Sequence, residues 1–174
     1  ISVCNHVTSW GKQSLKFRTD VAMMGKMGYD IEVDKMTENE LKFSQNAVVT
    51  YNRIKDIIYT GDLYRLISPY DENRAVLMYV NDSKSKSVLF GYNLNVRFGE
   101  TLNRVKLQGL DPGKTYKVQE INVSNEKRGP DMGMGMGPGT SESGRSYTGD
   151  FLMNIGLNIG SATPLTSVVY EITE

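Results

Sequence analysis

The chain of 174 residues is poor in the residue types that most often bind metals or form cross-links. Cys4 is the one cysteine, so no disulfide can form within the chain and the cysteine content does not indicate a compartment. His6 is the one histidine. These two residues offer two ligands, whereas zinc sites take about three or four from the protein. The sequence therefore predicts no metal site and no cofactor, and Cys4 is expected to be a small buried residue near a strand end.

Net charge is absent as well, since Lys and Arg number 20 and Asp and Glu also number 20. Without an excess of positive charge, no long-range attraction draws the chain to nucleic acid or to an anionic membrane surface. Long apolar runs are missing too, because no segment approaches the roughly 20 apolar residues needed to cross a bilayer. The sequence therefore predicts neither a nucleic-acid partner nor a membrane partner, and it leaves the localisation open.

Motifs for nucleophilic catalysis are missing. The sequence has no Gly-x-Ser-x-Gly elbow, and one histidine cannot be matched to a serine and an aspartate. A Cys–His dyad is disfavoured because the two residues lie on one predicted strand, whereas dyads draw their members from separate elements. Asp30 and Asp150 are expected in a turn, a loop or a strand end, and Asp20 is expected to be a surface charge or part of a local ion pair. No carboxylate pair indicates acid–base chemistry, so no catalytic residue is assigned.

Two stretches have apolar residues at three-to-four spacing, which predicts helices over residues 14–25 and 37–59. The second stretch begins with the form of a capping box, with Thr37 at the N-cap and Glu40 three residues later. After Gly61 the apolar period changes to near-alternation, which is typical of strands. The predicted strands cover residues 62–67, 74–80, 87–95, 104–107, 115–121, 152–159 and 167–172. Short strands separated by turn signals favour an antiparallel β-sandwich.

The segment 129–145 alternates glycine with methionine and contains two prolines, so it is predicted to be a surface loop. It is not a dinucleotide-binding fingerprint, because Pro138 stands where the third glycine should fall. The alternative is a binding surface lined by methionine, whose side chain adapts to varied partners.

Four motifs in sequence order resemble α-galactosidases of glycoside hydrolase family 36. The first is a His-Val-Thr segment at residues 6–8, followed by an aromatic-Arg-x-x-Val-Ala-Met-x-Gly-x-x-Gly-Tyr-Asp run at 17–30. The second is the Gly-Asp-x-Tyr-Arg-Leu segment at 61–66, in which Leu63 takes a position that is aromatic in the family. The third and fourth are Leu-x-Gly-Leu-Asp-Pro at 107–112 and Gly-Asp-x-Leu-Met-Asn-x-Gly-Leu at 149–157.

The resemblance implies an α+β fragment with two parts. Residues 1–60 would be the last strand and terminal helices of a (β/α)8 barrel, and residues 61–174 an antiparallel β-sandwich packed on that barrel. The parent would be a retaining α-galactosidase acting on terminal α-galactosides of the melibiose or raffinose type. The catalytic aspartate pair of the family has no counterpart here and would precede Ile1. The chain itself would therefore be non-catalytic and structural, with α-galactoside oligosaccharides as partners through the parent enzyme.

Three residues are candidates for substrate binding: His6, Thr8 and Trp10. They follow the last barrel strand of the resemblance, and barrel active sites are built from the loops after strands. A tryptophan in a loop can stack on the face of a sugar. The alternative for Trp10 is a residue of the core or of a domain interface.

A barrel remnant without its sheet would expose apolar side chains of residues 17–24. We expect this surface to be covered either by packing of the helices on the sandwich or by assembly into a homo-oligomer. Two other functional classes stay open. A carbohydrate-binding module would carry exposed aromatics in a row on one face, whereas buried aromatics would count against it. A structural or interaction protein without any link to sugars is the second.

Overall fold

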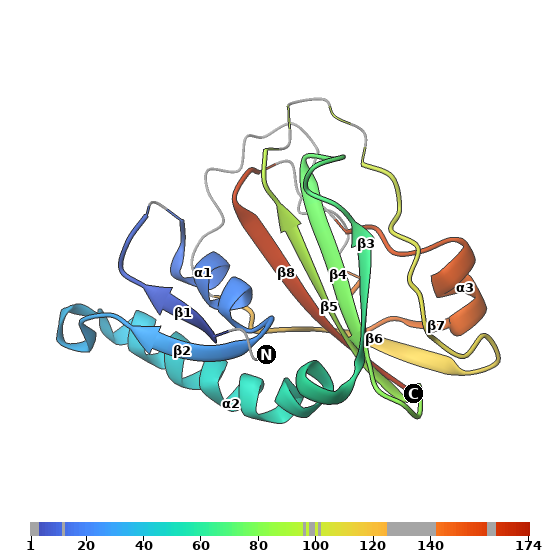
Figure 1. The fold of residues 1–174 in the computed structure, drawn as a ribbon, viewed down its shortest axis with the longest axis horizontal. Helices are drawn as coiled ribbons and strands as arrows, with labels where there is room; N and C mark the ends of the chain where they lie inside the picture. The colour runs from blue at the N-terminus through green and yellow to red at the C-terminus, as the bar shows by residue number, and fades with distance from the viewer. Residues whose placement is uncertain are drawn as a thin grey trace.

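The computed structural model of the chain describes residues 4–11, 13–95, 97, 100, 102–124, 142–159 and 163–174. Its centre is a six-stranded antiparallel sheet with the strand order β3-β4-β5-β8-β6-β7 (Figure 1). The strands are β3 (Asp62–Ile67), β4 (Arg74–Val80), β5 (Lys86–Asn93), β6 (Thr115–Ile121), β7 (Ser146–Thr148) and β8 (Thr166–Thr173). The predicted α+β fold with an antiparallel sheet is confirmed.

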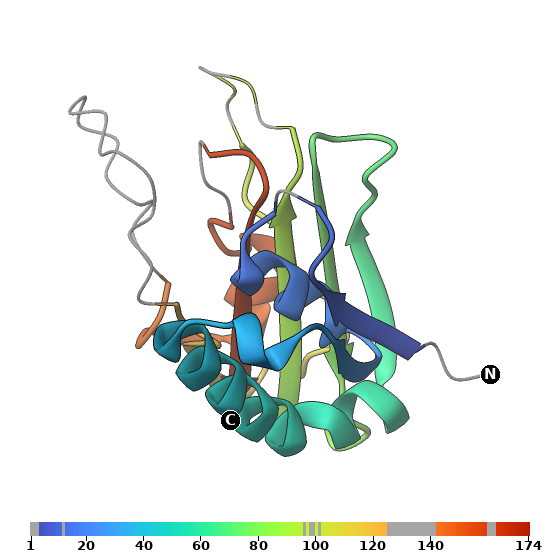
Figure 2. The same ribbon diagram turned by 90° about the vertical axis from the view of Figure 1, so that its left-hand side faces the viewer.

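A smaller unit precedes this sheet. β1 (Cys4–Thr8) and β2 (Lys26–Asp30) pair in parallel, and α1 (Leu15–Ala22) connects them. Parallel strands require such a crossover, so this unit has the βαβ form. A short 3-10 helix, η1 (Val33–Lys35), leads into the long helix α2 (Glu38–Thr60). Figures 1 and 2 show α1 and α2 on one side of the large sheet, with the β1–β2 pair beyond α1.

The two predicted helices are confirmed, although α1 is shorter than predicted and ends at Ala22. The capping box of α2 forms as expected. The Thr37 hydroxyl accepts a hydrogen bond from the Glu40 backbone N–H at 3.3 Å, and the Glu40 carboxylate accepts one from the Thr37 N–H at 2.8 Å. This second bond is the main reason that the pKa of Glu40 is lowered from its ordinary value. None of the helices in the described part of the chain is long and apolar enough to cross a membrane.

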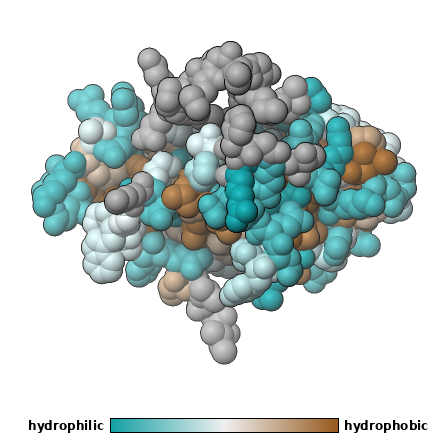
Figure 3. All heavy atoms as spheres, turned by 90° about the horizontal axis from the view of Figure 1, so that it is seen from above, coloured by the Kyte–Doolittle hydropathy of each residue, from teal (hydrophilic) through white to brown (hydrophobic). Residues whose placement is uncertain are grey.

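Both faces of the large sheet are covered. On one face, residues of α1 and α2 pack with alternate side chains of β4, β5 and β8, and the ring of Phe17 meets that of Tyr92 edge-on at 5.7 Å. Phe17 and Met23 are buried in this contact. The prediction that the helices cover their apolar side by packing on the part after α2, which holds the large sheet and α3 and is called the β-domain below, is therefore confirmed. Seen from above, apolar residues outside the grey atoms lie in small groups between polar ones (Figure 3).

On the other face, the covering layer consists of the chain around 105–110, helix α3 (Gly149–Asn154) and the segment that follows it. Two strand predictions are wrong here. Residues 104–107 make one isolated bridge, between Val105 and Leu157, and no regular ladder. Residues 152–159 begin inside α3, because the Thr148 hydroxyl accepts from the Phe151 N–H at 3.2 Å and caps a helical turn.

The predicted loop at 129–145 lies outside the described residues except for its last four. Within those, Glu142 is buried, and its carboxylate accepts hydrogen bonds from the Tyr147 hydroxyl at 2.6 Å and the Asn158 N–H at 3.1 Å. Glu142 thus ties β7 to the segment after α3.

Candidate functional site

The three predicted binding residues lie at and just beyond the C-terminal end of β1. Val7 is fully buried with Leu15 and Ala22 of α1. Because successive side chains of a strand alternate between its faces, His6 and Thr8 point to the opposite, open face. His6 is exposed, Thr8 is half-buried, and Trp10, in the loop after β1, is 79% exposed. The core interpretation of Trp10 is therefore wrong for this chain.

β2 contributes to the same face. The parallel register pairs His6 with Gly28 and Thr8 with Asp30. A Cβ added to Gly28 would lie 3.0 Å from Cδ2 of the His6 imidazole, so the missing side chain makes room for the ring. No strand is predicted over residues 26–30, so β2 is an element that the sequence patterns did not indicate. Asp30, predicted in a turn or at a strand end, is an exposed carboxylate that ends β2 beside Thr8.

Cys4 is exposed on this open face, two residues before His6, so the prediction of a buried cysteine is wrong. β1 lies at the edge of the βαβ unit, and only its Val7 face packs against apolar side chains. Within the described residues, no three His, Cys, Asp or Glu side chains gather in a way that could hold a metal ion.

The end of β1 is tied to α1. The backbone carbonyl of Thr8 accepts a hydrogen bond from the guanidinium of Arg18, on the first turns of α1. Arg18 also borders a hollow of about 330 Å³ between the loops that follow β1 and β2, together with Ser9, Ile31 and Glu40. The side chain that fixes the end of β1 thus comes from the helix that packs against the large sheet.

Asp20 is predicted to be a surface charge or part of a local ion pair, and the first of these alternatives is wrong. Its side chain is fully buried between α1 and the large sheet. The carboxylate accepts hydrogen bonds from Lys16 Nζ at 2.6 Å, Asn122 Nδ2 at 2.5 Å and Ser167 Oγ at 2.7 Å. The ion pair with Lys16 is the local contact that was foreseen, and the two other donors come from the β-domain.

The backbone of Asp20 is fixed as well, because the buried Tyr92 hydroxyl donates to its carbonyl at 2.8 Å. Burial raises the pKa of the Asp20 carboxyl above its ordinary value, and the contacts with Lys16, Ser167 and Asn122 oppose this change. One signal in the sequence could have found the burial. Position 20 lies three residues after Phe17 and three before Met23, on the apolar stripe of the helix.

Residues 81–83 and 122–124 each match the Asn-x-Ser acceptor pattern for N-glycosylation. The contact of Asn122 with Asp20 decides the second case. The side-chain nitrogen of Asn122, which glycosylation would modify, is buried against Asp20. The pattern at 122–124 is therefore no glycosylation site in the folded chain.

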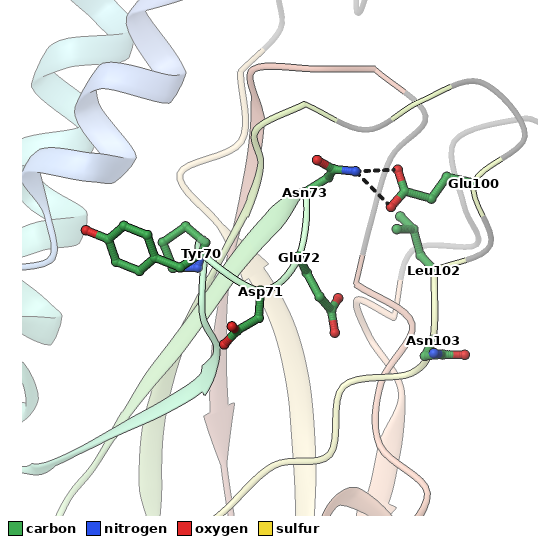
Figure 4. A pocket seen from close by; sticks show the side chains of 8 residues that line it. Tyr70, Asp71, Glu72, Asn73, Glu100, Leu102 and Asn103 are labelled. Carbon is green, nitrogen blue, oxygen red and sulfur yellow. Dashed lines mark hydrogen bonds between the residues drawn. The ribbon is translucent and has the colours of Figure 1, made fainter.

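A second hollow, of about 430 Å³, lies at the loop between β3 and β4 (Figure 4). Two of its three carboxylates have partners, because Glu72 pairs with Arg74 at 2.8 Å and Glu100 accepts from Asn73 at 3.1 Å. Tyr70 borders the hollow, but its ring points away from Glu100 (Figure 4). The hollow is a polar depression beside the exposed β3–β4 loop.

Three of the four sequence motifs meet in the β-domain and pack on one another. A Cβ added to Gly109 would lie 2.5 Å from the ring of Tyr64, and one added to Gly149 would lie 2.0 Å from the carbonyl oxygen of Asp111. The Gly149 N–H also donates to the Lys114 carbonyl at 2.8 Å. These motifs therefore specify close packing.

The tyrosines of the strands count against a carbohydrate-binding module. Tyr92, Tyr116 and Tyr170 are buried, and Tyr79 is half-buried with its ring edge-on to Phe90. Buried rings cannot offer a row of sugar platforms. Among the described residues the exposed aromatics are Trp10 and Tyr70, on separate loops, and Tyr59, on α2, so they do not form a row on one face of the sheet.

Two family models match the chain. The model described as Melibiase matches residues 2–61, and the model described as Glycosyl hydrolase family 36 C-terminal domain matches residues 74–172. Among curated relatives, probable alpha-galactosidase G of Emericella nidulans is 32% identical over 158 residues, which cover 90% of this chain and 18% of that protein.

Solved structures of α-galactosidases from family 36 are similar to the chain as well. Alpha-galactosidase AgaB from Geobacillus stearothermophilus is similar with a TM-score of 0.77 and 26% identity, covering 97% of this chain and 21% of that chain. A variant of alpha-galactosidase AgaA from the same organism, solved with stachyose, has a TM-score of 0.77 at 25% identity and the same coverage. The chain spans only 15% to 18% of the length of the first two curated relatives it matches.

Proposed function

The chain belongs to glycoside hydrolase family 36, and from this membership we propose that it is the C-terminal part of a retaining α-galactosidase. The observation that carries the proposal is the order of the two parts. A parallel βαβ unit that matches the melibiase model precedes a sheet domain that matches the family's C-terminal domain. Residues 1–60 would close the catalytic barrel, and residues 61–174 would stabilise it. The chain alone would be inactive, because it lacks the catalytic aspartate pair expected upstream.

The proposed substrates are oligosaccharides with a terminal α-linked galactose, of the melibiose or raffinose type. The AgaA variant solved with stachyose supports this class. The test is to incubate the full-length enzyme that contains this chain with stachyose, raffinose and the β-galactoside lactose. Galactose should be released from the first two only, and NMR should detect it first as the α-anomer because the mechanism retains configuration. Release from lactose alone would contradict the proposal.

His6, Thr8 and Trp10 are proposed to lie near the galactose pocket. Their position at the C-terminal end of a parallel strand supports this, since barrel enzymes build their active sites there. The exposed carboxylate of Asp30, at the end of the neighbouring strand, extends the proposed surface.

Replacing Trp10 with alanine in the full-length enzyme is expected to raise KM about tenfold, equivalent to roughly 1.4 kcal/mol of binding. The value of kcat should stay nearly constant, because a stacking ring binds ground state and transition state alike. Tyr70→Ala is the matched control, since Tyr70 is a 97% exposed aromatic on a different loop. Unchanged KM for Trp10→Ala, or an equal rise for both variants, would remove Trp10 from the pocket.

Self-association is proposed for the chain when it is expressed without the rest of the barrel. Parallel sheets are normally covered on both faces, whereas the β1–β2 pair leaves one face and its strand edges open. Light scattering after size exclusion should give a mass above the 19.5 kDa of one chain. A clean monomer would contradict the prediction. Because Phe17 and Met23 are covered by the sheet, strong binding of a hydrophobic dye is not expected.

A further inference from the structure

We propose that Asp20 is a positioning residue of the enzyme, through which the C-terminal sheet domain holds the end of β1 at the substrate pocket. The inference rests on the proposed function, because it concerns the same pocket. It assigns a role to a carboxylate that lies apart from the reacting groups and touches no substrate.

The first step is the anchor between α1 and the sheet. The Asp20 carboxylate is fully buried and accepts from Asn122, which follows β6, and from Ser167, on β8. Asn122 has a φ of 53°, which is rare outside glycine. A side chain held by one donor on β8 and one directly after β6, with its backbone held by Tyr92, has little freedom to move.

The second step leads from α1 to β1. Arg18 lies two residues before Asp20 on the same helix, and its guanidinium donates to the Thr8 carbonyl. Ser14 caps α1 by accepting from the Phe17 N–H at 3.1 Å, so the connection from Thr8 to the helix is fixed at both ends. The placement of α1 therefore determines the position of Thr8 at the end of β1 and of the loop that carries Trp10.

The third step is the choice of variant. Oδ1 of Asp20 accepts from Asn122, and Oδ2 accepts from Lys16 and Ser167. Asp20→Asn removes the negative charge that holds Lys16, and its new NH₂ group can keep a bond to the sheet only if the Asn122 amide or the Ser167 hydroxyl turns round to accept. The volume of the side chain hardly changes, so the variant tests the hydrogen bonds and the charge.

The experiment measures the hydrolysis of p-nitrophenyl-α-galactoside by the full-length enzyme. Asp20→Asn is expected to raise KM about fivefold or more and to leave kcat within about twofold, after correction for the folded fraction. Tyr51→Phe is the matched control. The Tyr51 hydroxyl accepts from the Met27 N–H and donates to the Gly25 carbonyl, at the opposite end of the strand pair, so its loss should leave KM unchanged.

A double-mutant cycle tests the route through Arg18. If Asp20 acts by placing Arg18, then Asp20→Asn added to Arg18→Ala should raise KM no further than Arg18→Ala alone. If the effects of the two substitutions on KM multiply in the double variant, the route from Asp20 through Arg18 is refuted. If Asp20→Asn does not fold, Ser167→Ala, which removes one donor from β8, takes its place. A rise in KM of about twofold would support the positioning role, and an unchanged KM would overturn it.

The two proposals fail in different ways. A wild-type enzyme without α-galactosidase activity would refute the proposed function and this inference with it. An active wild type whose KM is unchanged by Asp20→Asn would refute the positioning role only.

Discussion

Replacing Asp20 with alanine is expected to lower the free energy of unfolding of the chain by about 3–5 kcal/mol, the usual cost of removing one partner of a buried ion pair. Lys16, whose side chain is only 11% exposed, would keep its charge without a partner, and Asn122 and Ser167 would lose their acceptor. Urea unfolding followed by circular dichroism measures the change.

The control for this experiment is Asp56→Ala, which removes an exposed carboxylate from α2. Surface substitutions of this kind change stability by about 0.5 kcal/mol or less. A loss below about 1 kcal/mol for Asp20→Ala would show that the anchor between α1 and the sheet contributes little to folding.

The substitution Gly156→Ala is expected to be comparably severe. Gly156 has a φ of +85°, and a Cβ there would lie 2.2 Å from the carbonyl oxygen of Val105. The left-handed backbone costs a non-glycine residue about 1–2 kcal/mol. Moving the backbone of Val105 to relieve the overlap adds roughly 1–3 kcal/mol.

Gly144→Ala separates these two costs. Gly144 has nearly the same φ, +84°, but a Cβ there would have nothing within 4 Å. Thermal or urea unfolding should therefore place Gly144→Ala between the wild type and Gly156→Ala. Equal losses for the two variants would mean that the close contact with Val105 does not matter.

Sequence patterns predicted those elements of this fold whose determinants are local. The capping box at Thr37 and the long apolar stripe after it place α2 within one residue of its observed bounds. β4 and β6 have their predicted bounds because the β-branched and alternating apolar residues of 74–80 and 115–121 leave little ambiguity.

The errors arise where distant segments decide. Residues 152–159 read as a strand on apolar content, but the cap at Thr148 starts a helix there. Asp20 looked like a surface charge because its donors Asn122 and Ser167 lie 102 and 147 residues away in the sequence. The residues next to Asp20 in the sequence therefore do not reveal these two hydrogen-bond partners.

The candidate site shows the same division. His6, Thr8 and Trp10 share one strand and the loop after it, so their proximity follows from the sequence alone. The membership of Asp30 in this group depends on β2 and on its parallel register with β1. β2 has only five residues with Gly28 at its centre, so its sequence resembles a turn. The reason for the glycine is visible only in the structure, where the His6 ring packs beside it.

The central claim is that this chain is a non-catalytic part of an α-galactosidase. The most direct test assays the isolated chain and the full-length enzyme side by side with p-nitrophenyl-α-galactoside at equal molar concentration. The full-length enzyme is expected to release p-nitrophenol, and the isolated chain is expected to release none above the uncatalysed rate. Activity of the isolated chain would contradict this expectation and would direct attention to the exposed carboxylates of Asp30 and Asp150. Inactivity of both would contradict the proposed specificity while leaving the fold in place.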